Sequence, residues 1–141
     1  LANQATSREL RFLPQLIEAL ESDHPVKRYW GAIGCRILAN QAGPAHKALQ
    51  QALNDDWADV RIAAAEALAY LNESEGACET IAQVLTQHSE RDPYEVLAAL
   101  NTLDAMVQAE QVSLTTAKAM VRGLKLKEPA DRIPNYLLSL P

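Results

Sequence analysis

The sequence predicts an all-α domain, a right-handed superhelix of about four stacked helix pairs, and three observations carry this prediction. Alanine and leucine supply 24 and 20 of the 141 residues, and both are strong helix formers. Val, Ile and Thr total only 19 residues and the aromatic side chains seven, fewer than a sheet would require. The chain also repeats itself after 33 residues, a period typical of stacked supersecondary units.

The repeat appears as eight identities between residues 16–43 and residues 49–76. A unit of this length holds two helices, and one pair alone cannot bury its apolar face. We therefore expect stacking to create the core, with residues 1–141 forming a single domain. The identical pairs are Leu16 and Leu49, Ala19 and Ala52, Leu20 and Leu53, Asp23 and Asp56, Arg28 and Arg61, Ala32 and Ala65, Leu38 and Leu71, and Gly43 and Gly76.

The first unit is expected to begin at a capping box formed by Thr6 and Glu9. An amphipathic helix follows and runs through Leu20. The segment Asp23-His24-Pro25 ends this helix and starts the next, because proline is well placed in a first helical turn. The second helix of the unit is expected to reach about Leu38.

The second unit follows a break at Gly43-Pro44 and has a first helix around residues 48–53 and a second around 60–71. A turn at Asp55-Asp56 joins these two helices. Small residues on the second helices of both units are expected to let neighbouring helices approach closely. They are Gly31, Gly34, Ala63, Ala64, Ala65 and Ala67.

A third, looser unit has a first helix around residues 81–85 and a second that opens at Asp92-Pro93. The loop between them, near residues 88–92, is expected to be longer than in the other units. A fourth pair is expected at residues 114–126 and 131–140. Pro134 is compatible with the last helix only inside its first turn or as a kink.

Charge excludes some classes of function. Residues 51–111 carry two basic and twelve acidic side chains, which argues against a nucleic-acid surface because such surfaces need clustered Lys and Arg.

No apolar run reaches the roughly 18 residues of a membrane span. A basic stripe near the C-terminus fits either a solvated helix or contact with a sulfated or acidic polymer. It comprises Lys118, Arg122, Lys125 and Lys127.

No catalytic residue, metal ligand or cofactor site is predicted for this chain. Its two Cys and three His do not have zinc-site spacing, and Cys35 is expected to be a buried, inert thiol. Asp55, Asp56 and Asp59 could hold a hard cation, but capping of a helix N-terminus explains them better.

The candidate interaction residues are Tyr29, Trp30, Ile33 and Ile37. Trp30, Ile33 and Ile37 recur at helical spacing, and the 33-residue shift maps them to a more polar set in the second unit. The first unit is therefore expected to have an additional apolar face that docks against another domain or a preceding helix. Packing of Trp30 inside its own repeat is the alternative.

The turn segments Asp23-His24-Pro25-Val26-Lys27-Arg28 and Asp56-Trp57-Ala58-Asp59-Val60-Arg61 resemble those of HEAT repeats. The resemblance implies a HEAT-like solenoid in which turn Asp and helix Arg side chains link neighbouring repeats. The ladder would use Asp23, Arg28, Asp56 and Arg61, and it would end at the third unit, where Glu95 or Val96 replaces the Arg.

A narrower resemblance rests on Arg28-Tyr29-Trp30-Gly31-Ala32 within residues 23–34, followed by residues 60–68 and 98–104. In this order they resemble the C-terminal HEAT-like extension of some bacterial sulfatases. That resemblance implies a non-catalytic module, with the formylglycine and calcium in an upstream catalytic domain of the same chain. Because the sequence opens at Leu1, we expect a piece of a longer chain, periplasmic or secreted if its parent is a sulfatase.

Three functions remain open at this point. The module would brace or shape a sulfatase catalytic domain or mediate assembly, or it would be a free-standing protein-binding scaffold, or it would be a HEAT-like lyase. An exposed Trp30 stripe would favour the first. A continuous polar or acidic groove along the second helices would favour the second. A buried cluster of perturbed ionisable groups would favour the third.

Overall fold

The computed structural model describes residues 1–88 and 92–141, and within these ranges every regular element is a helix. This confirms the all-α helical-repeat solenoid. The elements are α1 (Ala2–Ala5), the 3₁₀ helix η1 (Leu10–Phe12), α2 (Leu13–Leu20), α3 (Pro25–Leu38), the 3₁₀ helix η2 (Ala39–Ala45), α4 (His46–Ala52), α5 (Ala58–Ala69), α6 (Ser74–His88), α7 (Pro93–Gln108), α8 (Leu114–Val121) and α9 (Arg132–Ser139).

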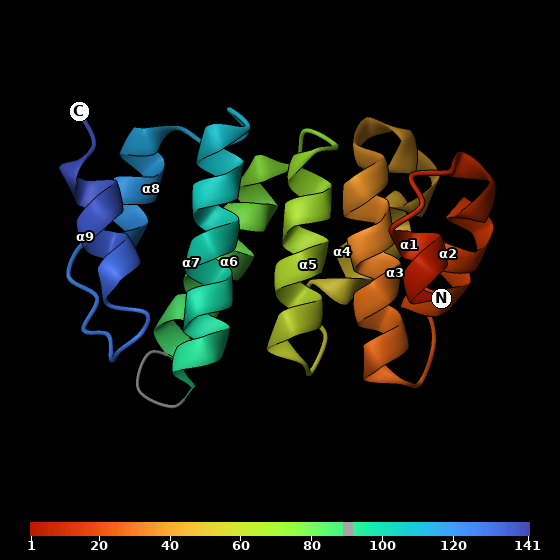
Figure 1. Cartoon of the computed structure of the whole chain (residues 1–141), viewed down its shortest axis with the longest axis horizontal. Coiled ribbons are helices and arrows are strands. Elements are labelled where there is room, and N and C mark those ends of the chain that lie inside the picture. The colour runs from red at the N-terminus through yellow and green to blue at the C-terminus, as the bar shows by residue number, and fades with distance from the viewer. Residues whose placement is uncertain (89–91) are drawn as a thin grey trace.

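The helices form two layers along the long axis of the molecule (Figure 1). The second helices α3, α5 and α7 lie side by side in one layer, and α4 and α6 lie behind them. Each second helix also packs on the first helix of its own pair, and α8 and α9 pack together at the C-terminal end. None of the described helices combines the length and apolar character needed to cross a membrane.

The capping box expected at Thr6 and Glu9 is wrong. Thr6 ends the short helix α1, and its hydroxyl donates to the carbonyl of Ala2 at 3.1 Å. Glu9 precedes η1 and makes no capping hydrogen bond with its side chain. The regular α-helix begins only at Leu13, because Pro14 lacks an amide proton and fits the first turn but not a helix interior.

Three later boundaries also follow from local chemistry. Gly43-Pro44 lies inside the 3₁₀ segment η2 rather than in an open turn. Helix α8 ends at Val121, earlier than expected, and Gly123 just beyond it has a φ of +82°, a value that favours glycine. Pro134 falls in the first turn of α9, where it is tolerated. Residues 89–91 of the longer loop expected in the third unit lie outside the described residues.

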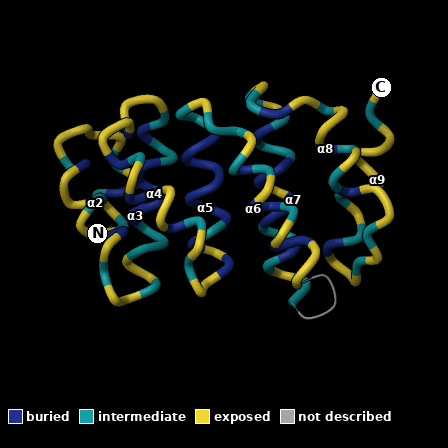
Figure 2. Tube along the Cα trace, turned by 180° about the vertical axis from the view of Figure 1, so that it is seen from behind, coloured by how far each residue is buried: buried dark blue, intermediate teal, exposed yellow. Residues whose placement is uncertain are grey.

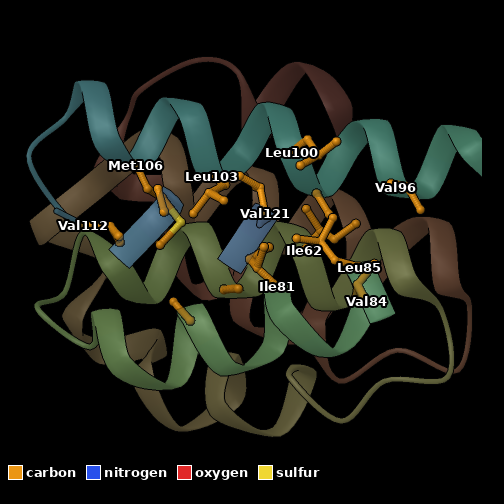
Figure 3. Packing of buried hydrophobic residues seen from close by; sticks show 14 of the residues in the cluster. Ile62, Ile81, Val84, Leu85, Val96, Leu100, Leu103, Met106, Val112 and Val121 are labelled. Atoms are coloured by element: carbon orange, nitrogen blue, oxygen red, sulfur yellow. The ribbon is translucent and has the colours of Figure 1, made fainter. Parts of the chain in front are cut away.

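The core consists of two clusters that meet at α5. The N-terminal cluster is built around Leu16, Leu38, Leu49 and Leu68. The C-terminal cluster, drawn in Figure 3, includes Ile81, Leu85, Leu100, Leu103 and Leu137. Helix α5 gives Val60 and Ala64 to the first and Ile62 and Ala65 to the second, and it is buried along most of its length (Figure 2). The stack is therefore one continuous body centred on α5.

Candidate binding face on the second helices

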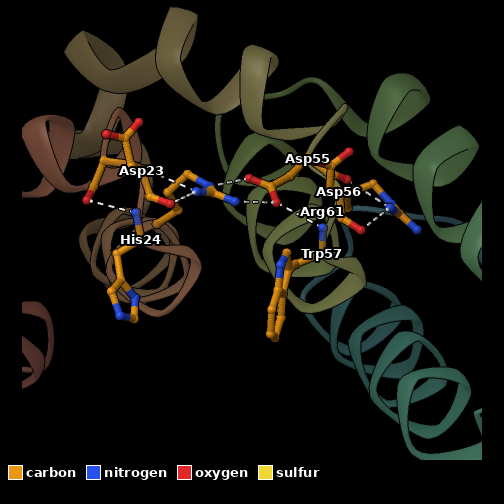
Figure 4. A network of polar contacts seen from close by, with 8 residues as sticks. Asp23, His24, Asp55, Asp56, Trp57 and Arg61 are labelled. Atoms are coloured by element: carbon orange, nitrogen blue, oxygen red, sulfur yellow. Dashed lines mark hydrogen bonds and ion pairs between the residues drawn. The ribbon is translucent and has the colours of Figure 1, made fainter.

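A polar ladder joins the turn of the first repeat to the turn of the second (Figure 4). The Arg28 guanidinium donates to the carbonyl oxygens of Ser22 at 3.0 Å and Asp23 at 3.1 Å. Its Nη2 donates to Asp55 Oδ1 at 2.9 Å, and its Nε donates to the other carboxylate oxygen. The fork thus ties α3 to the turn that precedes α5.

The structure corrects which carboxylate the ladder uses. The resemblance implied the side chains of Asp23 and Asp56, but these two residues contribute main-chain carbonyls, and Arg61 donates to the carbonyls of Asp55 at 2.8 Å and Asp56 at 3.4 Å. The Asp55 carboxylate is only 6% exposed, and it also accepts from the Trp57 amide at 2.9 Å. This Asx-type turn directs Asp55 toward the first repeat and leaves Asp56 exposed.

The ladder keeps its carboxylate ionised. Burial raises the pKa of Asp55, but hydrogen bonds from Arg28 and the Trp57 amide outweigh it and hold the pKa below its ordinary value. The hydrogen bond to Asp55 in turn raises the pKa of Arg28 against the effect of its burial. The two repeats are therefore joined by a charged, bidentate pair, the strong class of protein hydrogen bond.

The four predicted interaction residues divide into two sets. All four are half-buried, and Tyr29, Trp30 and Ile33 pack against the N-terminal cluster. The rings of Tyr29 and Trp30 meet edge to face, with centroids 5.6 Å apart. Tyr29 and Ile33 line a surface between α3 and α5, whereas Trp30 and Ile37 do not. Trp30 is thus half-buried against the N-terminal cluster and lies outside the two pockets that Tyr29 and Ile33 line.

Two adjoining pockets form a groove along the second helices. The first has a volume of about 320 Å³ and lies between the N-terminal ends of α3 and α5. The second, of about 110 Å³, lies farther along and also reaches α7. Tyr29 and Asp59 line both, so we treat them together as the second-helix groove. The first pocket is lined by Pro25, Val26, Tyr29, Trp57, Asp59 and Val60.

Trp57 is the residue of this groove that the sequence reasoning missed. Its side chain is 54% exposed, and Val26, on the opposite wall, is 52% exposed. The Trp57 amide donates to Asp55, and the Trp57 carbonyl accepts from the main-chain amides of Val60 and Arg61, while the indole points away from the polar network (Figure 4). The repeat contained a signal for this position. The 33-residue shift maps Trp57 to His24, and both residues lie just before a second helix and therefore outside it.

Some charged side chains in the groove form an ion pair, and one does not. Arg36 of α3 donates to Glu66 of α5 at 3.0 Å, and the Glu66 side chain is 8% exposed. Asp59, which borders both pockets, is exposed, and its carboxylate makes no hydrogen bond or ion pair within residues 1–88 and 92–141. The groove therefore offers an apolar wall beside one available negative charge.

The thiols of the described residues are poorly suited to nucleophilic chemistry. Cys35 is fully buried, and burial raises its pKa to about 12. Burial also raises the pKa of Cys78. Both thiols stay protonated at neutral pH, whereas the thiolate is the reactive form. Within the described ranges, no group of three or more His, Cys, Asp or Glu side chains is placed to hold a metal ion.

The basic stripe near the C-terminus is partly engaged. Lys118 of α8 donates to the carbonyl of Leu140 and so ties the end of the chain to α8. Arg122, Lys125 and Lys127 are exposed in the segment after α8. Lys118 therefore has a structural contact, and the stripe does not occupy a single helical face because α8 ends at Val121.

Comparison with known families gives one match. The family model of the HEAT repeat matches residues 47–74, which cover most of α4, all of α5 and the turn between them. A search of curated proteins found no match, and a search of solved structures found none. The central repeat is thus HEAT-like, and repeats of this family are typically non-catalytic scaffolds that commonly mediate protein interactions. This match suggests a helical-repeat interaction module.

Proposed function

We propose that this protein is a binding scaffold whose second-helix groove takes up an extended segment of another protein. The observation that carries the proposal is the apolar pocket of about 320 Å³ flanked by Val26 and Trp57, both more than half exposed. Large apolar side chains that gather at a concave site and stay accessible to water are typical of protein-interaction surfaces. A continuous polar or acidic groove along the second helices is the feature expected of a free-standing scaffold, and the observed groove combines an apolar wall with the exposed carboxylate of Asp59.

The groove is organised before any partner arrives. Asp55 fixes the main chain at Trp57 and is itself held by Arg28, while the Arg36–Glu66 pair spans α3 and α5 at the other end of the groove. Binding then needs little reordering of the scaffold, and the entropic cost of association is correspondingly smaller. This arrangement supports a recognition role for the face formed by α3, α5 and α7.

Site-specific photo-cross-linking in the cells that naturally make the protein tests the proposal. A benzophenone amino acid replaces Val26 in the groove or, as the matched control, Tyr136 on α9, which is 48% exposed. We expect a discrete polypeptide adduct from position 26 and none from position 136. Identical adduct patterns from both positions, or none from either, would contradict a binding role for the groove.

The finer hypothesis places the partner in the same chain, as the catalytic domain of a sulfatase. Its support is the resemblance carried by Arg28-Tyr29-Trp30-Gly31-Ala32 and the two segments that follow it. Under this proposal the parent is periplasmic or secreted and its catalytic domain holds the calcium. The mass of the native polypeptide decides: a much larger chain with a formylglycine peptide supports it. A chain of about 15.5 kDa with Met a few residues before Leu1 refutes it.

A further inference from the structure

We propose that the second-helix groove selects segments in which a Lys or Arg lies beside a bulky apolar side chain. This inference rests on the proposed binding function and names the chemistry of the partner. The apolar side chain would enter the pocket between Val26, Tyr29 and Trp57. The cationic side chain would reach Asp59 at the boundary between the two pockets.

The apolar half of the inference follows from the pocket walls. Val26 and Tyr29 belong to α3, and Trp57 directly precedes α5, so the pocket lies across the junction of two repeats. Filling it would remove the exposed faces of Val26 and Trp57 from water, and burial of such area drives association. Tryptophan is also enriched among the side chains that dominate binding free energy.

The cationic half follows from the groove's available charge. Arg36 of α3, which lines the second pocket, is already paired with Glu66, and Arg28 of α3 is paired with Asp55. Asp59 has no such partner among the described residues, and it is exposed. A Lys or Arg there would also lie near the rings of Tyr29 and Trp57, where aromatic faces attract cations.

The net negative charge of the surrounding chain also favours a cationic partner. Residues 51–111, which include the whole of α5, α6 and α7, carry twelve acidic and two basic side chains. A cationic segment is therefore attracted during the approach as well as in the bound state. An acidic segment could exploit the N-terminal ends of α3 and α5, but it would meet Asp56 and Asp59 there, both exposed and negatively charged.

Selection from a random peptide library tests the inference, because the library presents many combinations of apolar and charged side chains to the groove. Twelve-residue random peptides displayed on phage are selected on the immobilised 141-residue protein. The enriched sequences are then synthesised, and their affinities are measured by fluorescence anisotropy. We expect the enriched peptides to share a Leu, Ile, Phe or Trp next to a Lys or Arg.

The variants Trp57→Ala, Asp59→Asn and Asp59→Lys then assign the two halves of the motif. Trp57→Ala is expected to weaken binding about thirtyfold, the loss typical of a central anchor. Asp59→Asn is expected to weaken it about threefold and Asp59→Lys about tenfold, with both losses shrinking at high salt. Tyr136→Ala on α9 removes an exposed aromatic residue far along the stack and should leave the affinity unchanged.

The outcomes separate the inference from the proposed function. Peptides that require Trp57 but carry no basic residue and are indifferent to Asp59→Lys would overturn the charge rule and leave groove binding intact. Failure to enrich any motif, or peptides that bind Trp57→Ala as well as wild type, would overturn both. Circular dichroism melting of each variant shows that a lost affinity is not a lost fold.

Discussion

Helices α3 and α5 hold equivalent places in successive repeats but are buried very differently. Ten of the twelve residues of α5 are buried, whereas α3 keeps Tyr29, Trp30 and Ile33 half-exposed. The cause is position: α5 packs on α3, α4, α6 and α7, while α3 has neighbours chiefly in α1, α2 and α5. The same repeat unit thus supplies the structural centre of the stack at one place and part of the proposed binding face at another.

Helices α3 and α5 also use different small residues to pack closely against neighbouring helices. A Cβ at Gly31 of α3 would lie 2.8 Å from the Leu16 carbonyl oxygen and 2.9 Å from the Leu20 nitrogen, both main-chain atoms. Helix α2 therefore lies closer than an alanine would permit. Helix α5 achieves close packing on several sides with a run of alanines, including Ala64, which is fully buried. Glycine thus permits a main-chain contact with one helix, and alanine permits close packing against several helices.

The largest effect is expected where α3 meets α2. Gly31→Leu would force main-chain atoms of α2 to move, and we expect a loss of about 3 kcal/mol in the free energy of unfolding. Gly43→Ala is the matched control, because a Cβ there would meet nothing within 4 Å, and it should be neutral or stabilise by about 0.5 kcal/mol. Urea unfolding measures both. Equal midpoints for wild type and Gly31→Leu would contradict the close approach.

The next effect concerns the centre of the stack. Ala64→Leu adds three carbons at a fully buried site, so overpacking should cost about 2 kcal/mol. Ala119→Leu makes the same change on an exposed face of α8 and should alter stability by no more than about 0.5 kcal/mol. If thermal melting shows the two substitutions to be equivalent, α5 is not the tightly packed centre that its burial indicates.

A third test removes the ion pair that spans the two helices. Arg36→Met leaves the Glu66 carboxylate, 8% exposed, without its cation, and we expect a cost of about 1.5 kcal/mol. Adding Glu66→Leu to this variant removes the unpaired charge and should recover most of the loss. Chemical unfolding of the two single variants and the double variant provides the cycle. A double variant no more stable than Arg36→Met alone would refute the coupling.

The sequence was sufficient for the repeat and for the second helices, but not for every first helix. The boundaries of α3 were predictable because Pro25 fixes its start and the apolar pattern reaches Leu38. The start of α2 was not, because the capping signal at Thr6 competes with the demand that Pro14 lie in a first turn. The capping signal at Thr6 was therefore outweighed by Pro14, which lies eight residues later in the chain.

The residues of the candidate binding face were less predictable than the fold. Asp55 and Asp56 are adjacent acids, and only the geometry of the turn decides which carboxylate faces Arg28. Trp57 lies in a turn segment of the sequence. Its place in the groove was not predictable, because it depends on which residues α3 places opposite it. Tyr29 and Ile33 were predicted as interaction residues, and whether they bind a partner is what the cross-linking and selection experiments decide.

The smallest expected effect concerns the ladder that ties the start of α3 to the start of α5, and it depends on pH. The pKa of Asp55 lies below its ordinary value, because hydrogen bonds from Arg28 and Trp57 outweigh the opposing effect of burial. A lowered folded-state pKa contributes stability above the unfolded-state pKa of about 3.9, and this contribution is lost as pH falls through the folded-state value.

Asp55→Asn removes this titration while keeping the size of the side chain. We expect the variant to be about 1 kcal/mol less stable than wild type at pH 7, with a gap that closes below about pH 4 as the wild type loses its ionised pair. Urea unfolding at pH 7, 5, 4 and 3 measures the gap. Asp56→Asn, an exposed neighbour whose side chain lies outside the ladder, should stay within about 0.5 kcal/mol of wild type throughout. A gap for Asp55→Asn that stays constant down to pH 3 would mean that α3 and α5 are coupled by packing alone and not by the charged pair.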